Sequence, residues 1–244
     1  MTDTVRPSPT HVHPTGMTLR DPVSSASHLV TAVWAVYATL VLLRLTRGGF
    51  DRKAAVGIYG LSMVLLYLAS GTFHGLFYDS PDERRFFQKL DQSAIYLLIA
   101  GTNTPMMVFL LDGAWRRWFL RVVWGLAAAG IACQWLLPKP PHQLIVAIYL
   151  GMGWLGVIPA VRYYRALGWR AMNWVLVGAM LYTIGAVCEL AKWPVIWRDG
   201  IVVGPHEVLH LLDAAASVAF FLFVCRFVVT YEGPPVRSGE TAAA

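Results

Sequence analysis

The chain has 244 residues, of which 57% are apolar and only 14% are charged, and its formal net charge is +6. The charged share is about half that of an ordinary soluble domain. This composition excludes a disordered chain, a coiled coil and most soluble enzymes. The three cysteines lie singly inside apolar stretches, which excludes a disulfide scaffold. The basic residues form no stripe with interleaved aromatic side chains, so we expect no nucleic-acid partner.

Residues 1–25 are polar and contain no apolar core of a cleaved signal peptide, so we interpret them as a disordered tail. Residues 231–244 form a second polar tail. Between them, residues 26–230 carry seven apolar stretches, each long enough to cross about 30 Å of hydrocarbon as a helix. These stretches are 26–46, 55–77, 91–111, 118–137, 143–161, 171–190 and 206–229. Because none shows the alternation of a membrane β-barrel, the sequence predicts an all-α integral membrane protein, a seven-transmembrane helix bundle.

The short connections between the stretches carry the charges that orient such a bundle. The connections after the first, third and fifth stretches, together with the C-terminal tail, hold twelve of the 20 lysines and arginines. The positive-inside rule therefore favours a cytoplasmic C-terminus and an external N-terminus. We expect a multi-pass protein of the cell membrane that interacts with membrane lipids.

A few polar and ionisable side chains within the stretches gather at one depth. Such groups are functional candidates because burying them in a membrane is costly. Ser70 and His74 lie late in the second stretch, four residues apart on one helix face. Asp91 begins the third stretch, and His206 and His210 begin the seventh. Since successive spans run in opposite directions, all five side chains lie toward the same side of the membrane.

The three histidines predict a metal site. A single histidine in a helix is more often a core or interfacial residue, but two imidazoles four residues apart converge on one ion, and His74 supplies a third. Three histidines with an open fourth position are the ligands of a catalytic zinc ion, which acidifies bound water and polarises a carbonyl. Asp91 is then placed to hold or deprotonate the water. Ser70 is placed to donate a hydrogen bond to a developing oxyanion.

The chain resembles the hemolysin III proteins in two segments, SGTFHGLFYDSPDERRFFQKLDQSAIYLLIAGTNTP and HEVLHLL. These proteins are the bacterial branch of the family of adiponectin and progestin receptors, in a superfamily that also contains alkaline ceramidases. The resemblance covers about residues 26–230. It implies a zinc ion held by His74, His206 and His210, with Asp91 and Ser70 around the bound water. It also implies hydrolysis of a lipid amide, as in the ceramidase-like members.

Two residues depart from the family pattern, since Asn103 stands where an aromatic residue is usual and Asp213 where an apolar residue is expected. Asp213 shares a helix face with His206 and His210, so it either orients His210 or lines a water-filled cavity. His28, at the start of the first stretch, lies either near the site or at the membrane interface.

Other polar residues and prolines have structural interpretations. Asn103, Gln134 and Glu189 are expected to make interhelical hydrogen bonds. Pro105 and Pro159 are expected to kink the third and fifth spans.

Three functions compete. The first is a zinc-dependent hydrolase of lipid amides, whose lipid-like substrate enters from the bilayer. The second is a pore-forming, cytolytic protein, although no amphipathic pore-lining segment stands out. The third is a receptor-like signalling protein in which zinc is structural and ties the seventh span to the second. Asp91 distinguishes these hypotheses, because a purely structural site needs no carboxylate beside an open coordination position.

Overall fold

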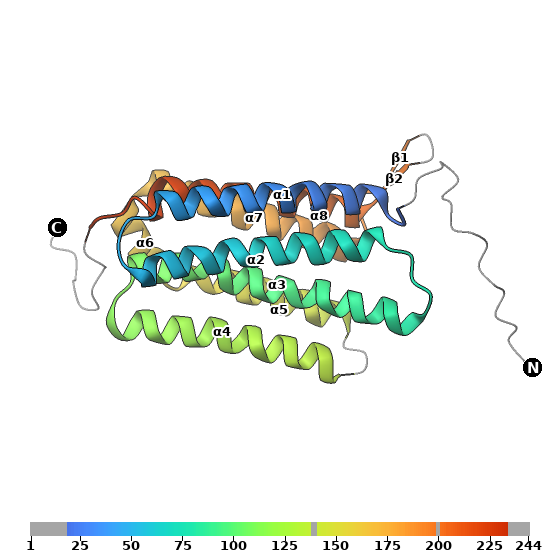
Figure 1. Ribbon diagram of the computed structural model, residues 1–244, viewed down its shortest axis with the longest axis horizontal. Helices are drawn as coiled ribbons and strands as arrows, with labels where there is room; N and C mark the ends of the chain where they lie inside the picture. Colours follow the sequence, from blue (N-terminus) through green and yellow to red (C-terminus); the bar gives the residue numbers. More distant parts are fainter. Residues whose placement is uncertain (1–18, 138–140, 199–200, 234–244) are drawn as a thin grey trace, which may run out of the picture.

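The computed structural model describes residues 19–137, 141–198 and 201–233 and confirms the all-α membrane bundle (Figure 1). Six of the helices in these residues are long and apolar enough to cross a membrane. They are α1 (Pro22–Leu45), α2 (Phe50–Gly75), α3 (Pro81–Leu110), α4 (Gly113–Leu136), α7 (Trp169–Ala191) and α8 (Pro205–Phe223), which continues as a π-helical turn at Val224–Val228. Two shorter helices, α5 (His142–Trp154) and α6 (Ala160–Leu167), are together long and apolar enough for a seventh crossing, if the bent pair is counted as one span.

The seventh crossing is broken rather than straight. A 3-10 turn at Leu155–Val157 follows α5, and the two helices meet at an angle of 46°. Pro159 stands directly before α6, where its missing N–H and its ring interrupt helical hydrogen bonding. The kink predicted at Pro159 is therefore confirmed. Pro105 lies within α3, which is one helix along its whole length, and the kink expected there stays a prediction.

Helix α3 begins at Pro81, well before the predicted span at residue 91. The Ser80 hydroxyl accepts a hydrogen bond from the Glu83 backbone N–H at 3.1 Å, and Pro81 occupies the first helical position. The first turns carry charged residues, so hydropathy could not include them. Asp91 consequently lies well inside the helix and not at its start.

The predicted polar tails, 1–25 and 231–244, lie mostly outside the described residues. Helix α1 begins at Pro22, four residues before the apolar stretch that predicted it. Directly before it, the Asp21 backbone N–H donates to the His74 carbonyl at 2.9 Å. The segment entering α1 is thus fixed against the end of α2, and this contact brings Asp21 to the site described below.

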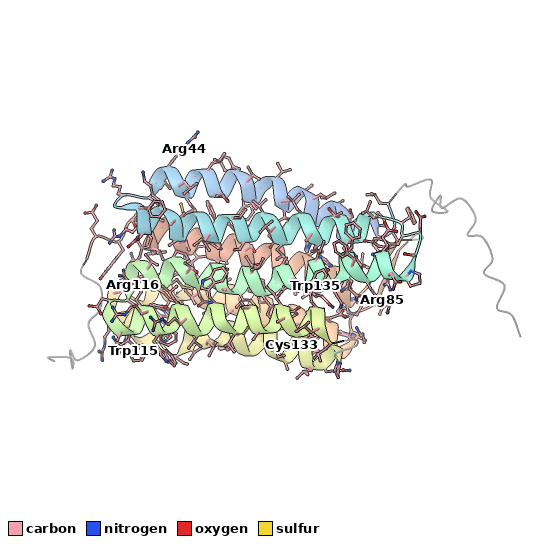
Figure 2. The ribbon with its side chains drawn as sticks, turned by 60° about the horizontal axis from the view of Figure 1, so that its bottom comes forward. Arg44, Arg85, Trp115, Arg116, Cys133 and Trp135 are labelled. Carbon is pink, nitrogen blue, oxygen red and sulfur yellow. The ribbon has the colours of Figure 1, made fainter. Side chains whose placement is uncertain are left out.

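The helices pack closely against one another, and their outer faces are apolar. Helix α3 is the most enclosed span, with α2 and α4 on either side of it (Figure 1). Glycines face bulky neighbours across the interfaces, as Gly130 of α4 does against Tyr96 of α3. Outward-facing apolar side chains, such as Val33 of α1, are suited to lipid. Figure 2 places Trp115 and Trp135 near opposite ends of α4, as expected for interfacial anchors.

A short hairpin precedes α8. Strands β1 (Ile196–Arg198) and β2 (Ile201–Val203) pair antiparallel, with Trp197 opposite Val202. These strands were not predicted from the sequence. They lie between the end of α7 and the start of α8, at the same end of the bundle as the start of α1 (Figure 1).

Candidate metal centre

Three histidines meet where α2 ends and α8 begins. His74 lies in the last turn of α2, and His206 and His210 occupy the first two turns of α8. The Nε2 atom of His206 lies 3.1 Å from Nε2 of His74 and 3.0 Å from Nε2 of His210. His74 and His210 are buried, whereas His206 is partly exposed. The structure thus brings together the three ligands that were predicted from positions far apart in the sequence.

This group fits a divalent metal ion. One nitrogen from each ring lies within 4.8 Å of the others. Ligand nitrogens at ordinary zinc–nitrogen distances in a tetrahedral site lie about 3.3 Å apart, close to the observed spacing. Imidazole nitrogens suit zinc as well as copper, iron and nickel, so the three histidines could hold a transition-metal ion.

Each histidine has a polar partner for its other ring nitrogen, Nδ1. His74 Nδ1 is 3.0 Å from Asp21 Oδ2, and His206 Nδ1 is 3.6 Å from Glu189 Oε2. His210 Nδ1 lies 2.7 Å from a ring nitrogen of His28. Partners of this kind fix the orientation and tautomer of metal-binding histidines. These contacts at Nδ1 therefore leave the Nε2 atom of each histidine directed toward one common point.

Asp21 is itself held in place by Arg20. The Arg20 guanidinium donates from two nitrogens to Asp21 Oδ2, at 3.0 and 2.9 Å, and it lies over the rings of Phe73 and Tyr78. Burial alone would raise the pKa of Asp21, but hydrogen bonds with His74 and Arg20 outweigh it and hold the pKa below its ordinary value. Asp21 is therefore an ionised acceptor for the His74 ring.

Asp91 and Ser70 occupy adjacent turns of α3 and α2 beside the histidines. The Asp91 carboxylate interacts with the Ser70 side chain and with the rings of His74 and His206. Ser70 is buried and does not line the adjoining cavity, whereas Asp91 does. Ser70 is thus placed to orient Asp91 and not to face the cavity, and its hydrogen bond to an oxyanion stays a prediction.

A cavity of about 830 Å³ extends from the histidines into the bundle. His74, Asp91 and His206 line it at the end that holds the metal centre, and Trp169 lines it near the opposite end of the bundle. Between them its wall is mostly apolar and comes from α3, α5, α7 and α8, with residues such as Ile99, Val146, Met172 and Leu176. The metal centre therefore opens onto a long apolar chamber.

The structure shows where His28 and Asp213 lie relative to the histidines. His28 lies next to the site, because it is buried on α1 and its ring is 3.9 Å from the His210 ring, centroid to centroid. Asp213 lines the cavity. No hydrogen bond joins its carboxylate to His210 within the described part of the chain, so its placement favours the second of its two predicted roles.

Of the three polar residues expected to make interhelical hydrogen bonds, some contact another helix and one does not. Gln134 of α4 bonds to Gln92 of α3, as expected for an interhelical contact. Asn103 donates instead to the Ile99 carbonyl of its own helix at 2.9 Å and lines the cavity. Glu189 does reach across helices, but its partner is His206, so it supports the metal centre. Neither this role of Glu189 nor the contact of Asp21 with His74 was predicted from the sequence.

Comparisons with known proteins show to which proteins this chain is similar. A family model described as Haemolysin-III related matches residues 18–221. Hemolysin-3 of Bacillus cereus is 30% identical over 208 residues, which cover 84% of this chain and 90% of that protein. A Hemolysin-3 homolog of Bacillus subtilis is 33% identical over 171 residues, covering 69% and 76%. An adiponectin receptor protein of Drosophila melanogaster is 25% identical over 188 residues, covering 70% of this chain and 42% of the receptor.

Proposed function

Because the chain belongs to the haemolysin-III-related family of multi-pass membrane proteins, and because its histidine centre opens onto an apolar cavity, we propose that it is a zinc-dependent hydrolase of lipid amides. We place it in the cell membrane and take its substrate to be a ceramide-like lipid. The observation that carries the proposal is Asp91, a carboxylate that lines the cavity beside the three histidines.

The cavity explains why a hydrolase is favoured over a structural metal site. A metal that only joins α2 to α8 needs neither an accessible chamber nor an acid–base group at its edge. Here the chamber is large enough for a lipid chain, since ligand cavities generally measure about 300–1,000 Å³. Its apolar wall would bind the chain and exclude bulk water from the reacting amide.

The residues of the chain have separable roles in the reaction. A zinc ion held by His74, His206 and His210 would supply Lewis acidity toward the amide carbonyl and toward water. Asp91 removes a proton from the attacking water as the new C–O bond forms. As the C–N bond breaks, Asp91 returns that proton to the departing nitrogen, which leaves as an amine beside a fatty acid. Ser70 keeps the Asp91 carboxylate oriented toward the cavity.

Substitution of Asp91 tests this proposal. We expect Asp91→Asn to retain its metal and to release amine from an N-acyl long-chain amide at least about 100-fold more slowly, the usual contribution of a general base. Metal is measured by mass spectrometry and amine by chromatography. Asp51→Asn is a matched control, since it removes an exposed carboxylate at the start of α2, at the opposite end of the bundle.

The other outcomes are equally informative. Unchanged turnover in Asp91→Asn would remove this residue from the mechanism. A metal-loaded wild type that hydrolyses no lipid amide would favour the receptor-like alternative, in which the metal is structural. The double variant His206→Ala/His210→Ala is expected to lose the metal, and retention of about one ion per chain would refute the three-histidine centre.

A further inference from the structure

Asp213 is a second carboxylate in the same cavity, and the reaction described above does not use it. It lies on α8, one turn beyond His210 and two turns beyond His206. Three residues of helix beyond His210 correspond to about 4.5 Å, and seven beyond His206 to about 10 Å, so Asp213 stands about one turn deeper in the bundle than the inner histidine. It lines the cavity, and its side chain is partly accessible there.

No residue in the described ranges gives the Asp213 carboxylate a hydrogen bond or an ion pair. The hydroxyls of Tyr67 and Tyr182 are nearby, but both bond to Ser217, at 2.6 and 2.9 Å. Tyr67 also donates to the Asp213 backbone carbonyl at 3.0 Å, which leaves the carboxylate oxygens free. The surrounding protein thus holds the backbone of Asp213 in place without satisfying its side chain.

Cations in the cavity wall lie toward the end with the metal centre, away from Asp213. Arg20 is paired with Asp21 at 2.9 Å, and Lys192 with Glu189 at 2.6 Å. Arg84 is in the first turn of α3, about two turns before Asp91. The charged groups that act on Asp213 are Asp91 and His206, both at the level of the metal centre, and Asp91 adds negative charge while His206 opposes it. A carboxylate inside a membrane span is costly unless a cation or a hydrogen-bond donor meets it, so the cavity at Asp213 is suited to a positively charged ligand.

We propose that Asp213 binds the protonated amino group of a long-chain amine whose hydrocarbon chain occupies the apolar part of the cavity. The ammonium group satisfies the free carboxylate, and the apolar wall contributed by residues such as Leu98 and Leu176 accepts the chain. An inorganic cation would pair with the carboxylate but would make no use of the apolar wall. The inference rests on the proposed function for its biological setting, because cleavage of a lipid amide releases an amine within this chamber.

Binding of matched single-chain ligands tests the proposal. The purified, metal-loaded protein in detergent is titrated with hexadecylamine and with hexadecan-1-ol, which share a chain and differ in charge. We expect the wild type to bind the amine more tightly. In Asp213→Val the Kd for the amine should rise about tenfold or more, the usual worth of a charged hydrogen bond. The Kd for the alcohol should change by less than about twofold.

Controls separate the carboxylate from general effects of charge and folding. Asp213→Asn keeps the shape of the side chain and is expected to lose the preference for the amine as Asp213→Val does. Asp51→Asn should keep the preference. Equal binding of amine and alcohol by the wild type would overturn the proposal. So would a preference that survives in both Asp213 variants, or one that disappears in Asp91→Asn but survives in Asp213→Val.

The binding assay contains no amide and needs no turnover. Loss of the amine preference in a protein that still hydrolyses lipid amides would therefore refute the role of Asp213 alone. Conversely, an amine site at Asp213 in a protein without hydrolytic activity would refute the proposed function and leave the site standing.

Discussion

At the scale of single residues, the histidine centre depends on a carboxylate that belongs to no span. Asp21 Oδ2 is 3.0 Å from His74 Nδ1 and is held by Arg20. We expect Asp21→Asn to lower metal affinity about 10- to 100-fold, because the anionic acceptor that orients His74 is lost. Competition with a chelator of known affinity measures the change.

Asp79 provides the matched comparison for Asp21. It is an exposed acidic residue in the connection after α2, at the same end of the bundle. Asp79→Asn should bind metal as the wild type does. Equal affinities in the wild type, Asp21→Asn and Asp79→Asn would show that the Asp21 contact does not support the metal.

The residues that the sequence predicted and those that it missed differ in a physical way. His206 and His210 share a helix face at any orientation of their helix, and the alternation of spans brings His74 to their side. Asp21 has no such periodic signal, because its place depends on how the segment before α1 folds back against the end of α2. Glu189 was visible as an intramembrane acid, but spacing alone could not choose His206 as its partner.

At the scale of helices, small residues set how closely the spans approach. A Cβ on Gly130 of α4 would overlap the Tyr96 ring of α3, whereas a Cβ on Gly125 of the same helix would meet nothing within 4 Å. We expect Gly130→Leu to lower the free energy of unfolding by about 1–3 kcal/mol, the usual cost of overpacking. Gly125→Leu should have little effect. Unfolding in mild detergent measures both, and equal stability of the two variants would contradict this packing.

Hydropathy found every crossing but not every boundary. The stretch at 91–111 predicted only the apolar part of α3, because Pro81 starts a helix whose first turns are charged. The stretch at 143–161 contained the break at Pro159 but could not reveal that α6 continues to Leu167. Strands β1 and β2 are too short for an alternating pattern, although Asp199 and Gly200 between them are typical hairpin-turn residues. Interior helical segments were thus predictable, and their ends depended on local capping and packing.

At the scale of the whole molecule, the two ends of the bundle differ in charge. Figure 2 places Arg44 and Arg116 at one end and Arg85 at the other. Of the lysines and arginines in the described residues, most lie at the end with Arg44, and the metal centre lies at the opposite end. The positive-inside rule predicts that the metal centre faces out of the cytoplasm. The opposite orientation would turn the metal centre toward the cytoplasm.

Reporter fusions in a bacterial host decide between these orientations. We expect green fluorescent protein at the C-terminus to fluoresce and alkaline phosphatase there to be inactive, because the C-terminal end of α8 shares the basic end of the bundle. Alkaline phosphatase fused after Asp79, in the connection between α2 and α3, should be active as the internal control. The opposite pattern at both positions would place the metal centre in the cytoplasm. The outcome matters for the proposed function, because it decides which leaflet lies at the end of the bundle where the histidines meet the apolar cavity.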